Sequence, residues 1–370
     1  MICKFFSFPL NARMALAAVV AFAAMAGAPV YAADVIGLTL PLENRLSPVA
    51  KRIEFGAQLA AQKLSKSGQS VELALFNDGC DADNAPAIAR SLHEAGTKII
   101  IGPVCFRVAT ALAKHAKESN GAIASIPIIT VNTRNKMLNR LREVDELPLY
   151  SVSNAPNAEA RAVVDLLLPR FGNRPFAILD DGSVYGRALT DDIRELGEQA
   201  GLRAVVSSNF RPLQTTQIAM LRRLRKSGVE AVFIAAAAED VVTIANDIRK
   251  LKLNWMIATG ERGQLLPYAA TPDSNMAGLL MVSEREMATE DRQKQIGDIG
   301  ELELDNGLLL GHALVEIAAA AIDRGLNDLS GQSFDTIIGQ VAFDKNGRAS
   351  PIPFVASQWR DGVFEVVQGN

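Results

Sequence analysis

The chain has 370 residues, of which 49% are hydrophobic and 21% charged, and its formal net charge is −3 at pH 7. A mildly acidic chain without a basic stripe is a poor candidate for binding nucleic acid, because phosphate recognition needs clustered Lys and Arg. At roughly 150 residues per domain, this length favours about two domains.

The N-terminal segment has the three parts of a secretory signal peptide. Lys4 and Arg13 form a basic front, residues 14–26 an apolar core, and a small-residue cleavage site ends at Ala32. The core is shorter than the roughly 20 helical residues that span a bilayer. We therefore expect export, removal of residues 1–32 and a mature chain that is not inserted in a membrane. A retained membrane anchor is the alternative.

Short β-branched runs then alternate with longer helical patterns. The predicted strands are 35–40, 71–76, 98–101 and 126–131, and the predicted helices are 50–65, 85–95 and 108–117. Alternation of this kind predicts a parallel sheet covered by helices on both faces.

The alternation restarts after an irregular stretch at 151–157, which predicts a second lobe of the same kind. Its strands are expected at 175–180, 203–207, 231–235, 255–258 and 277–282, and its helices at 186–200, 216–226 and 240–251. The charged segment 284–303 is expected to be mostly surface helix.

The last part of the chain is too short for a third lobe. It contains one apolar helix at 311–323 and a strand pair at 337–343 and 354–359, with a turn signal between the strands. Some of this tail must complete each lobe, so the chain is expected to cross between the lobes more than once.

Two cysteines, Cys80 and Cys105, remain after Cys3 is removed with the signal peptide. An oxidising compartment would let them persist as a disulfide. Cys105 follows a predicted buried strand and turn, in the region where α/β folds bind ligands. Closing a loop of this length would stabilise the fold by roughly 3.5 kcal/mol in the chain-entropy description.

The sequence carries no constellation typical of catalysis or metal binding. Its three histidines, His93, His115 and His312, fall in separate predicted helices without ligand spacing. Neither G-x-S-x-G nor S-x-x-K occurs, and the glycines at 182 and 186 lack the lysine of a phosphate-binding loop. We expect no enzyme activity, no metal and no cofactor.

Five motifs follow one another behind the signal peptide: DGCD at 78–81, IGPVC at 101–105, DDGSVYG at 180–186, GERG at 260–263 and IGQVAFD at 338–344. In these, over essentially the whole mature chain, the sequence resembles type I periplasmic solute-binding proteins of the branched-chain amino-acid (Leu/Ile/Val) receptor family. The resemblance implies two Rossmann-like lobes with parallel central sheets and a three-segment hinge. It also implies a periplasmic monomer that closes on a small solute and presents it to ABC permease subunits.

The resemblance also suggests where the hinge lies. We expect the three crossings near 150–151, 282–283 and 341–342. Lobe 1 would then comprise 33–150 plus 283–341, and lobe 2 would comprise 151–282 plus 342–370.

In the first lobe, the resemblance brings Phe106 and Arg107 to the pocket, at the start of the helix after Cys105. Backbone N–H groups at a helix start suit a carboxylate. The family has a serine where this chain has Phe106, so a hydroxyl donor is missing and the cleft is more apolar. The alternatives are that Phe106 packs under the loop and that Arg107 is solvated.

Asn132 and Arg134 follow the fourth predicted strand, where the family presents backbone groups and a threonine hydroxyl to the ligand. Arg134 could clamp a ligand carboxylate through two hydrogen bonds. The alternative is a surface arginine paired with Glu143 or Asp145.

In the second lobe, the resemblance aligns Tyr185 with a tyrosine that caps the ligand. It aligns Glu261 with the acid that pairs with the ligand's α-ammonium group. A buried carboxylate without a partner is costly, so Glu261 needs either that ammonium or an internal cation. Pairing of Glu261 with Arg262 is the alternative.

Two departures leave the ligand's identity open. The family often places aromatic residues at two places where this chain has none. Here alanines occupy 235–238 in the second lobe, and Val49 lies near the other position, early in the first lobe. We therefore expect a small polar solute, an amino acid or an amide-like relative. The rival interpretation is a periplasmic sensor or partner-binding protein on the same fold, which would not deliver cargo.

Overall fold

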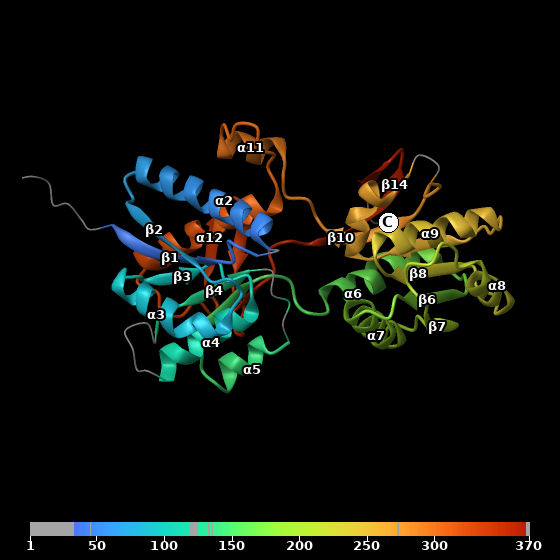
Figure 1. Ribbon diagram of the computed structural model, residues 1–370, viewed down its shortest axis with the longest axis horizontal. Helices are drawn as coiled ribbons and strands as arrows, with labels where there is room; N and C mark the ends of the chain where they lie inside the picture. Colours follow the sequence, from blue (N-terminus) through green and yellow to red (C-terminus); the bar gives the residue numbers. More distant parts are fainter. Residues whose placement is uncertain are drawn as a thin grey trace, which may run out of the picture.

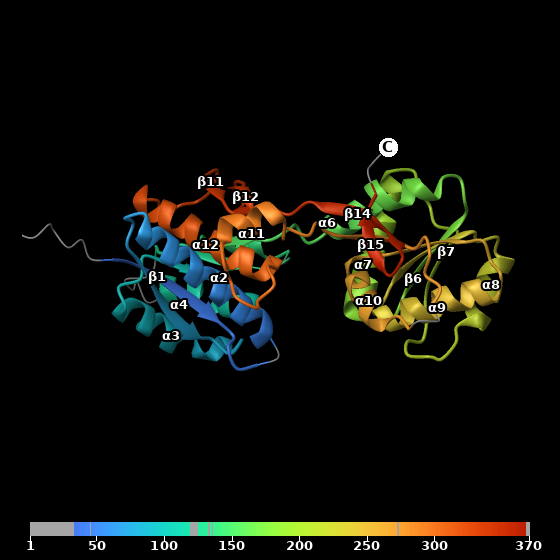
Figure 2. The ribbon, with the colours of Figure 1, turned by 90° about the horizontal axis from the view of Figure 1, so that it is seen from above.

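The computed structural model describes residues 33–44, 46–118, 125–131, 134, 136–271 and 274–367. Two α/β lobes lie side by side along the longest axis and are joined by extended segments (Figures 1 and 2). The predicted fold class, two lobes with parallel central sheets, is confirmed. The expected signal peptide and Asn132 lie outside the described residues.

The sheet of lobe 1 has six strands in the order β13-β5-β4-β3-β1-β2, and all of its pairings are parallel. Its strands are β1 (Asp34–Leu40), β2 (Val71–Asn77), β3 (Ile99–Ile101), β4 (Ile128–Val131), β5 (Leu149–Val152) and β13 (Arg348–Ala349). Because the strands are parallel, the loops that follow β3 and β4 leave the same edge of the sheet.

Helices cover both faces of this sheet. One face packs against α3 (Ala85–Glu94), α4 (Phe106–Glu118) and α5 (Leu138–Glu143), with the short η1 (Ala82–Asn84) before them. The other face packs against α2 (Ser47–Lys66) and α12 (Asn306–Asp323). Near these two helices lie α11 (Glu290–Ile296) and the hairpin of β11 (Ser333–Thr336) and β12 (Gly339–Ala342) (Figure 2).

The pair α2 and α12 is packed backbone to backbone through two glycines. A Cβ on Gly56 would lie 1.9 Å from the backbone oxygen of Leu308, and one on Gly311 would lie 2.0 Å from that of Ile53. By length and hydropathy α12 could span a membrane, but 67% of it is buried inside the protein. Its apolar character is therefore explained by its place in the core of lobe 1.

The sheet of lobe 2 has seven strands in the order β15-β14-β10-β9-β8-β6-β7. The strands β6 (Phe176–Asp180), β7 (Val206–Asn209), β8 (Ala231–Ala235), β9 (Met256–Thr259) and β10 (Leu280–Glu284) pair in parallel. The last two, β14 (Phe354–Arg360) and β15 (Val363–Val366), are antiparallel additions at one edge.

The α-helices of lobe 2 are α6 (Ala158–Ala162), α7 (Val184–Gln199), α8 (Ile218–Lys226), α9 (Ala238–Lys250) and α10 (Leu266–Ala269). A π-helical turn, η2 (Val163–Leu167), and two 3₁₀ turns, η3 (Leu168–Phe171) and η4 (Glu261–Leu265), accompany them. The run α6–η2–η3 was not predicted, although its buried apolar residues recur at helical spacing: Ala160, Val163, Val164, Leu167, Leu168 and Phe171. The charged segment 284–303 is helical only in α11, and its first residue ends β10.

Three passages join the lobes: 153–157 after β5, 285–289 after β10, and 350–353 between β13 and β14. The first two lie within a few residues of the expected crossings. The third lies beyond the expected 341–342, because β13 still pairs with β5 in the sheet of lobe 1. Val341 and Phe343 are likewise buried in the core of lobe 1.

The expected disulfide joins Cys80 and Cys105, whose Cα atoms are 5.4 Å apart. It connects the loop after β2 to the loop after β3 at the edge of the sheet that faces the other lobe. Beside it, the buried Asp78 accepts a hydrogen bond of 2.8 Å from the Cys80 backbone N–H, and burial raises the pKa of this carboxyl group.

Candidate solute-binding site

Arg134 connects the two lobes. It follows β4 in lobe 1, and its guanidinium donates two hydrogen bonds, of 2.6 and 3.0 Å, to the two carboxylate oxygens of Glu261 at the end of β9 in lobe 2. A further bond of 2.5 Å runs from its Nη2 to Glu284, the last residue of β10. The Arg134 side chain is 26% exposed and those of Glu261 and Glu284 are 24% and 16% exposed, so the pairs are shielded from solvent but not sealed.

A second acid lies behind this pair. Oε1 of Glu159, in the first turn of α6, accepts hydrogen bonds of 2.6 Å from the Tyr185 hydroxyl and 2.8 Å from the Glu261 backbone N–H. Glycine at 260 makes room for it, because a Cβ there would lie 2.3 Å from Glu159 Oε1. Glu159 is buried, and this burial raises the pKa of its carboxyl group.

The hinge contributes the remaining contacts. The side-chain amide of Asn154 donates a hydrogen bond of 2.7 Å to the Glu284 carboxylate and one of 2.8 Å to the backbone oxygen of Ile352. The guanidinium carbon of Arg134 lies 5.3 Å from the centre of the Phe354 ring, where β14 begins. We call the set Arg134, Asn154, Glu159, Tyr185, Glu261 and Glu284 the Arg134 network.

The electrostatics of the Arg134 network follow from its burial. Desolvation opposes the charge of Arg134, but hydrogen bonds and attraction from Glu261 and Glu284 outweigh it and raise the pKa of the guanidinium above its usual value. Burial, followed by the charge of Glu159, raises the pKa of the Tyr185 hydroxyl. These raised pKa values favour a cationic Arg134 and a neutral, hydrogen-bond-donating Tyr185 around neutral pH.

A family model for periplasmic binding proteins matches residues 35–351. The chain belongs to the periplasmic binding protein family. Among its relatives, the Leu/Ile/Val-binding protein BraC3 of Rhizobium johnstonii is 22% identical over 92% of this chain and 95% of its own length. The resemblance seen in the five sequence motifs is thereby confirmed.

Solved structures of similar fold come from several bacteria. An ABC transporter substrate-binding protein from Sphaerobacter thermophilus aligns with a TM-score of 0.68 at 17% identity, covering 92% of this chain and 97% of that one. A solute-binding protein from R. palustris in complex with benzoate aligns with a TM-score of 0.60 at 16% identity, covering 91% and 96%. These similarities show a shared fold.

In this periplasmic binding protein, three of the residues proposed for the pocket come together. Arg134 binds Glu261 directly, and Tyr185 joins them through Glu159. Arg134 is paired neither with Glu143 nor with Asp145. Glu261 is paired with Arg134 rather than Arg262.

Among the described residues, no hydrogen bond or ion pair joins Phe106 or Arg107 to the Arg134 network, and Asn132 lies outside these residues. Phe106 is partly buried and packs against the hydrophobic cluster that includes residues of α3, α4 and β3. Arg107 is exposed in the first turn of α4. The guanidinium of Arg262 stacks on the Tyr185 ring, with its Cζ 4.0 Å from the ring centre, and reaches Asp181 at 4.0 Å.

Sequence reasoning missed three members of the Arg134 network: Asn154, Glu159 and Glu284. Glu284 was assigned to a charged surface segment, yet it closes a buried strand. One signal was available for Glu159, since it is an acid flanked by alanines and followed by an apolar run. A carboxylate next to such a run either is buried together with hydrogen-bond or ion-pair partners or points to solvent.

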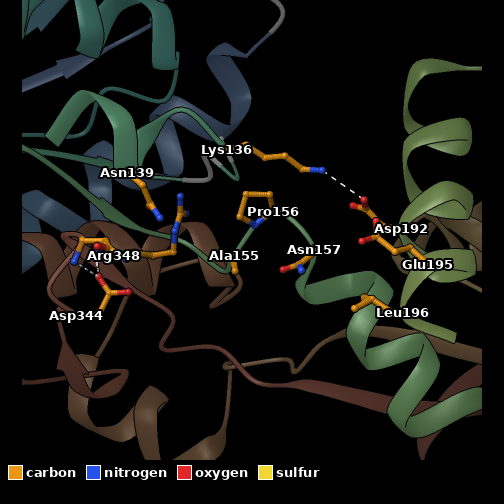
Figure 3. Close-up of a pocket in the computed structure, with 11 residues that line it drawn as sticks. Lys136, Asn139, Ala155, Pro156, Asn157, Asp192, Glu195, Leu196, Asp344 and Arg348 are labelled. Atoms are coloured by element: carbon orange, nitrogen blue, oxygen red, sulfur yellow. Dashed lines mark hydrogen bonds and ion pairs between the residues drawn. The ribbon is translucent and has the colours of Figure 1, made fainter. Parts of the chain in front are cut away.

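A polar pocket of about 440 Å³ opens between the lobes beside the first passage (Figure 3). Lys136 extends from lobe 1 towards Asp192 on α7, at 3.3 Å, and closes one side. Asn139 and Arg348 line the wall formed by lobe 1, and Glu195 lines the wall formed by α7. The interlobe space is thus bordered by charged side chains from both lobes.

No metal site accompanies these residues. Across the described ranges, no three His, Cys, Asp or Glu side chains are grouped so that they could hold a metal ion. The Arg134 network instead offers hydrogen-bond donors and acceptors at a junction between two lobes, an arrangement suited to binding a small polar molecule.

Proposed function

We propose that this protein is the solute-binding component of an ABC importer and that it binds a small polar solute between its lobes. The solute class is an amino acid or an amide-like relative, as the relatives' names and the resemblance suggest. The observation that carries the proposal is the Arg134 network, in which side chains from loops of both lobes meet at the carboxyl ends of the two parallel sheets. Open α/β sheets bind ligands at this edge.

The arrangement of the lobes supports binding by closure. Two separately cored lobes are joined by three short passages, so a rotation at the passages leaves each core intact. A solute that contacts both lobes favours the closed form by the difference in its affinity for the two forms. Permease subunits would then distinguish loaded from empty protein by the relative position of the lobes.

We further propose that the protein is exported and acts in the periplasm after removal of residues 1–32. The basic front and apolar core of this segment support the proposal. So does the disulfide, because it needs an oxidising compartment.

A thermal-shift screen of the mature protein tests the proposal. The screen uses amino acids, amides, short carboxylates and aromatic acids. A solute at 100 times its dissociation constant should stabilise the protein by about 2.7 kcal/mol. Small-angle scattering should then show a smaller radius of gyration with the solute bound. If no solute raises the melting temperature, delivery of cargo is the wrong function and the sensor or partner-binding interpretation takes its place.

A further inference from the structure

The carboxylates that border the interlobe junction already have internal partners. Both oxygens of Glu261 accept hydrogen bonds from Arg134, and Oε1 of Glu284 accepts from Arg134 and Asn154. A solute ammonium group gains a strong charge-assisted bond only from an oxygen that it can reach directly. At Glu261 this contact is taken by a cation that belongs to the protein.

Arg134 is firmly held in this position. Three of its N–H groups donate to carboxylates, its guanidinium lies over the Phe354 ring, and its side chain is three-quarters buried. An incoming ammonium group would have to displace it. That exchange would break two parallel hydrogen bonds and deprive the partly buried guanidinium of its bidentate partner, which is unfavourable for a buried charge.

The backbone and Tyr185 fix the other side of the junction. Glu261 donates its own N–H to Glu159, and Tyr185 donates its hydroxyl to the same oxygen. The backbone of Glu261 is therefore anchored to the buried Glu159, while its carboxylate is held by Arg134. The pair of Arg134 and Glu261 is built into the junction from both lobes.

We propose that Arg134 determines the specificity of the cleft by acting as an internal counter-ion to Glu261, so that the selected solute carries no α-ammonium group. The inference rests on the proposed function and narrows it. Of the solutes proposed above, the inference excludes the α-amino acids. The cleft selects a small des-amino molecule, a carboxylate or its amide, over the α-amino acid of the same carbon skeleton.

Three probes with one skeleton test this: leucine, 4-methylpentanoate and 4-methylpentanamide. Their dissociation constants are measured by isothermal titration calorimetry on the mature protein. We expect leucine to bind at least tenfold more weakly than the better of the two des-amino probes. Arg134→Gln frees the carboxylate of Glu261. In this variant we expect the affinity for leucine, relative to that for the same des-amino probe, to rise at least tenfold.

Two control variants keep the test specific. Arg134→Lys retains a cation at Glu261 and should keep the preference of the wild type. Lys117→Gln removes one charge in the last turn of α4, where Lys117 pairs with the exposed Glu146 of the same lobe, and should leave the ratio of affinities unchanged.

The outcomes separate this inference from the proposed function. If wild-type protein binds leucine as tightly as the des-amino probes, or if Arg134→Gln leaves the ratio unchanged, the role of Arg134 is overturned while solute binding stands. The wild-type ratio decides the matter even if Arg134→Gln does not fold. If neither these probes nor any member of the wider solute screen binds, both the inference and the proposed function fail.

Discussion

Arg134 and Glu261 are 127 residues apart in the chain and belong to different lobes, yet two hydrogen bonds of 2.6 and 3.0 Å join their side chains. Each residue follows a parallel strand, β4 in lobe 1 and β9 in lobe 2. The pair shows that the two sheet edges face each other closely enough for one long side chain to connect them. A solute in the cleft therefore meets a junction that is already bridged.

Breaking the ion pair between Arg134 and Glu261 should lower the free energy of unfolding by more than breaking an exposed ion pair does. In a double-mutant cycle with Arg134→Gln and Glu261→Gln, we expect a coupling energy of about 2 kcal/mol, because the pair is bidentate and mostly buried. Urea unfolding of the four proteins measures it.

The matched control is an exposed interlobe pair, Lys136 and Asp192, at 3.3 Å. Lys136 is 72% exposed, so Lys136→Gln with Asp192→Asn should show a coupling energy below about 1 kcal/mol. Equal coupling energies in the two cycles would mean that burial does not strengthen the interaction between Arg134 and Glu261.

Glu159 should make stability depend on pH in a characteristic direction. Burial raises the pKa of its carboxyl group in the folded protein. A raised pKa means that the folded state binds this proton more tightly than the unfolded state, so the buried charge lowers stability above the folded pKa. This penalty fades as the pH falls through the folded pKa towards the ordinary value for glutamate.

Glu159→Gln removes the charge while its amide oxygen still accepts from Tyr185. We expect the variant to gain stability relative to the wild type at pH 7 and to lose that advantage as the pH approaches 4.5, measured by urea unfolding across this range. Glu198→Gln, at an exposed position on α7, is the control and should show no such trend. A pH-independent difference for Glu159→Gln would contradict the assignment.

The disulfide should contribute measurably to the stability of lobe 1. It closes a loop with a sequence separation of 25 residues, which in the chain-entropy description stabilises the fold by about 3.5 kcal/mol. Cys80→Ser with Cys105→Ser should therefore lower the free energy of unfolding by roughly this amount. Reductant should destabilise the wild type and leave the double variant unchanged. If reductant affects both equally, its effect does not act through this bond.

Export should leave a defined N-terminus. When the full chain is expressed in a Gram-negative host, we expect intact-mass analysis of the periplasmic fraction to show loss of residues 1–32, with Ala33 first. Replacing Ala32 by a bulky residue should block cleavage there, because the signal peptidase site requires small residues. Recovery of the uncleaved chain in the membrane fraction would support a retained anchor instead.

Much of the fold could be predicted because buried parallel strands and their covering helices leave strong local patterns. The continuous apolar runs of β3, β6 and β8 are examples. β7 begins later than expected, since three of its four residues are exposed and its pattern is weak. The third passage was misplaced because the apolar residues of β12 do not reveal which lobe they pack against.

The candidate site was only partly predictable for a different reason. Arg134, Tyr185 and Glu261 stand in recognisable motifs, so their loops could be identified, although their contact with a solute stays a prediction. Glu159 and Glu284 stand in no motif, and they gain their meaning from meeting Arg134 across the hinge. A linear pattern cannot indicate that an arginine in one lobe is the partner of an acid in the other.

Asn154 gives the hinge a mechanical property. Its single amide group ties the first passage to Glu284 beside the second and to Ile352 in the third. The three connections are therefore held together at Asn154, and this point acts as the hinge about which the lobes rotate. A small rotation at this hinge gives a large displacement of the lobe surfaces farthest from it. A solute bound near the hinge can therefore change surfaces that it does not contact.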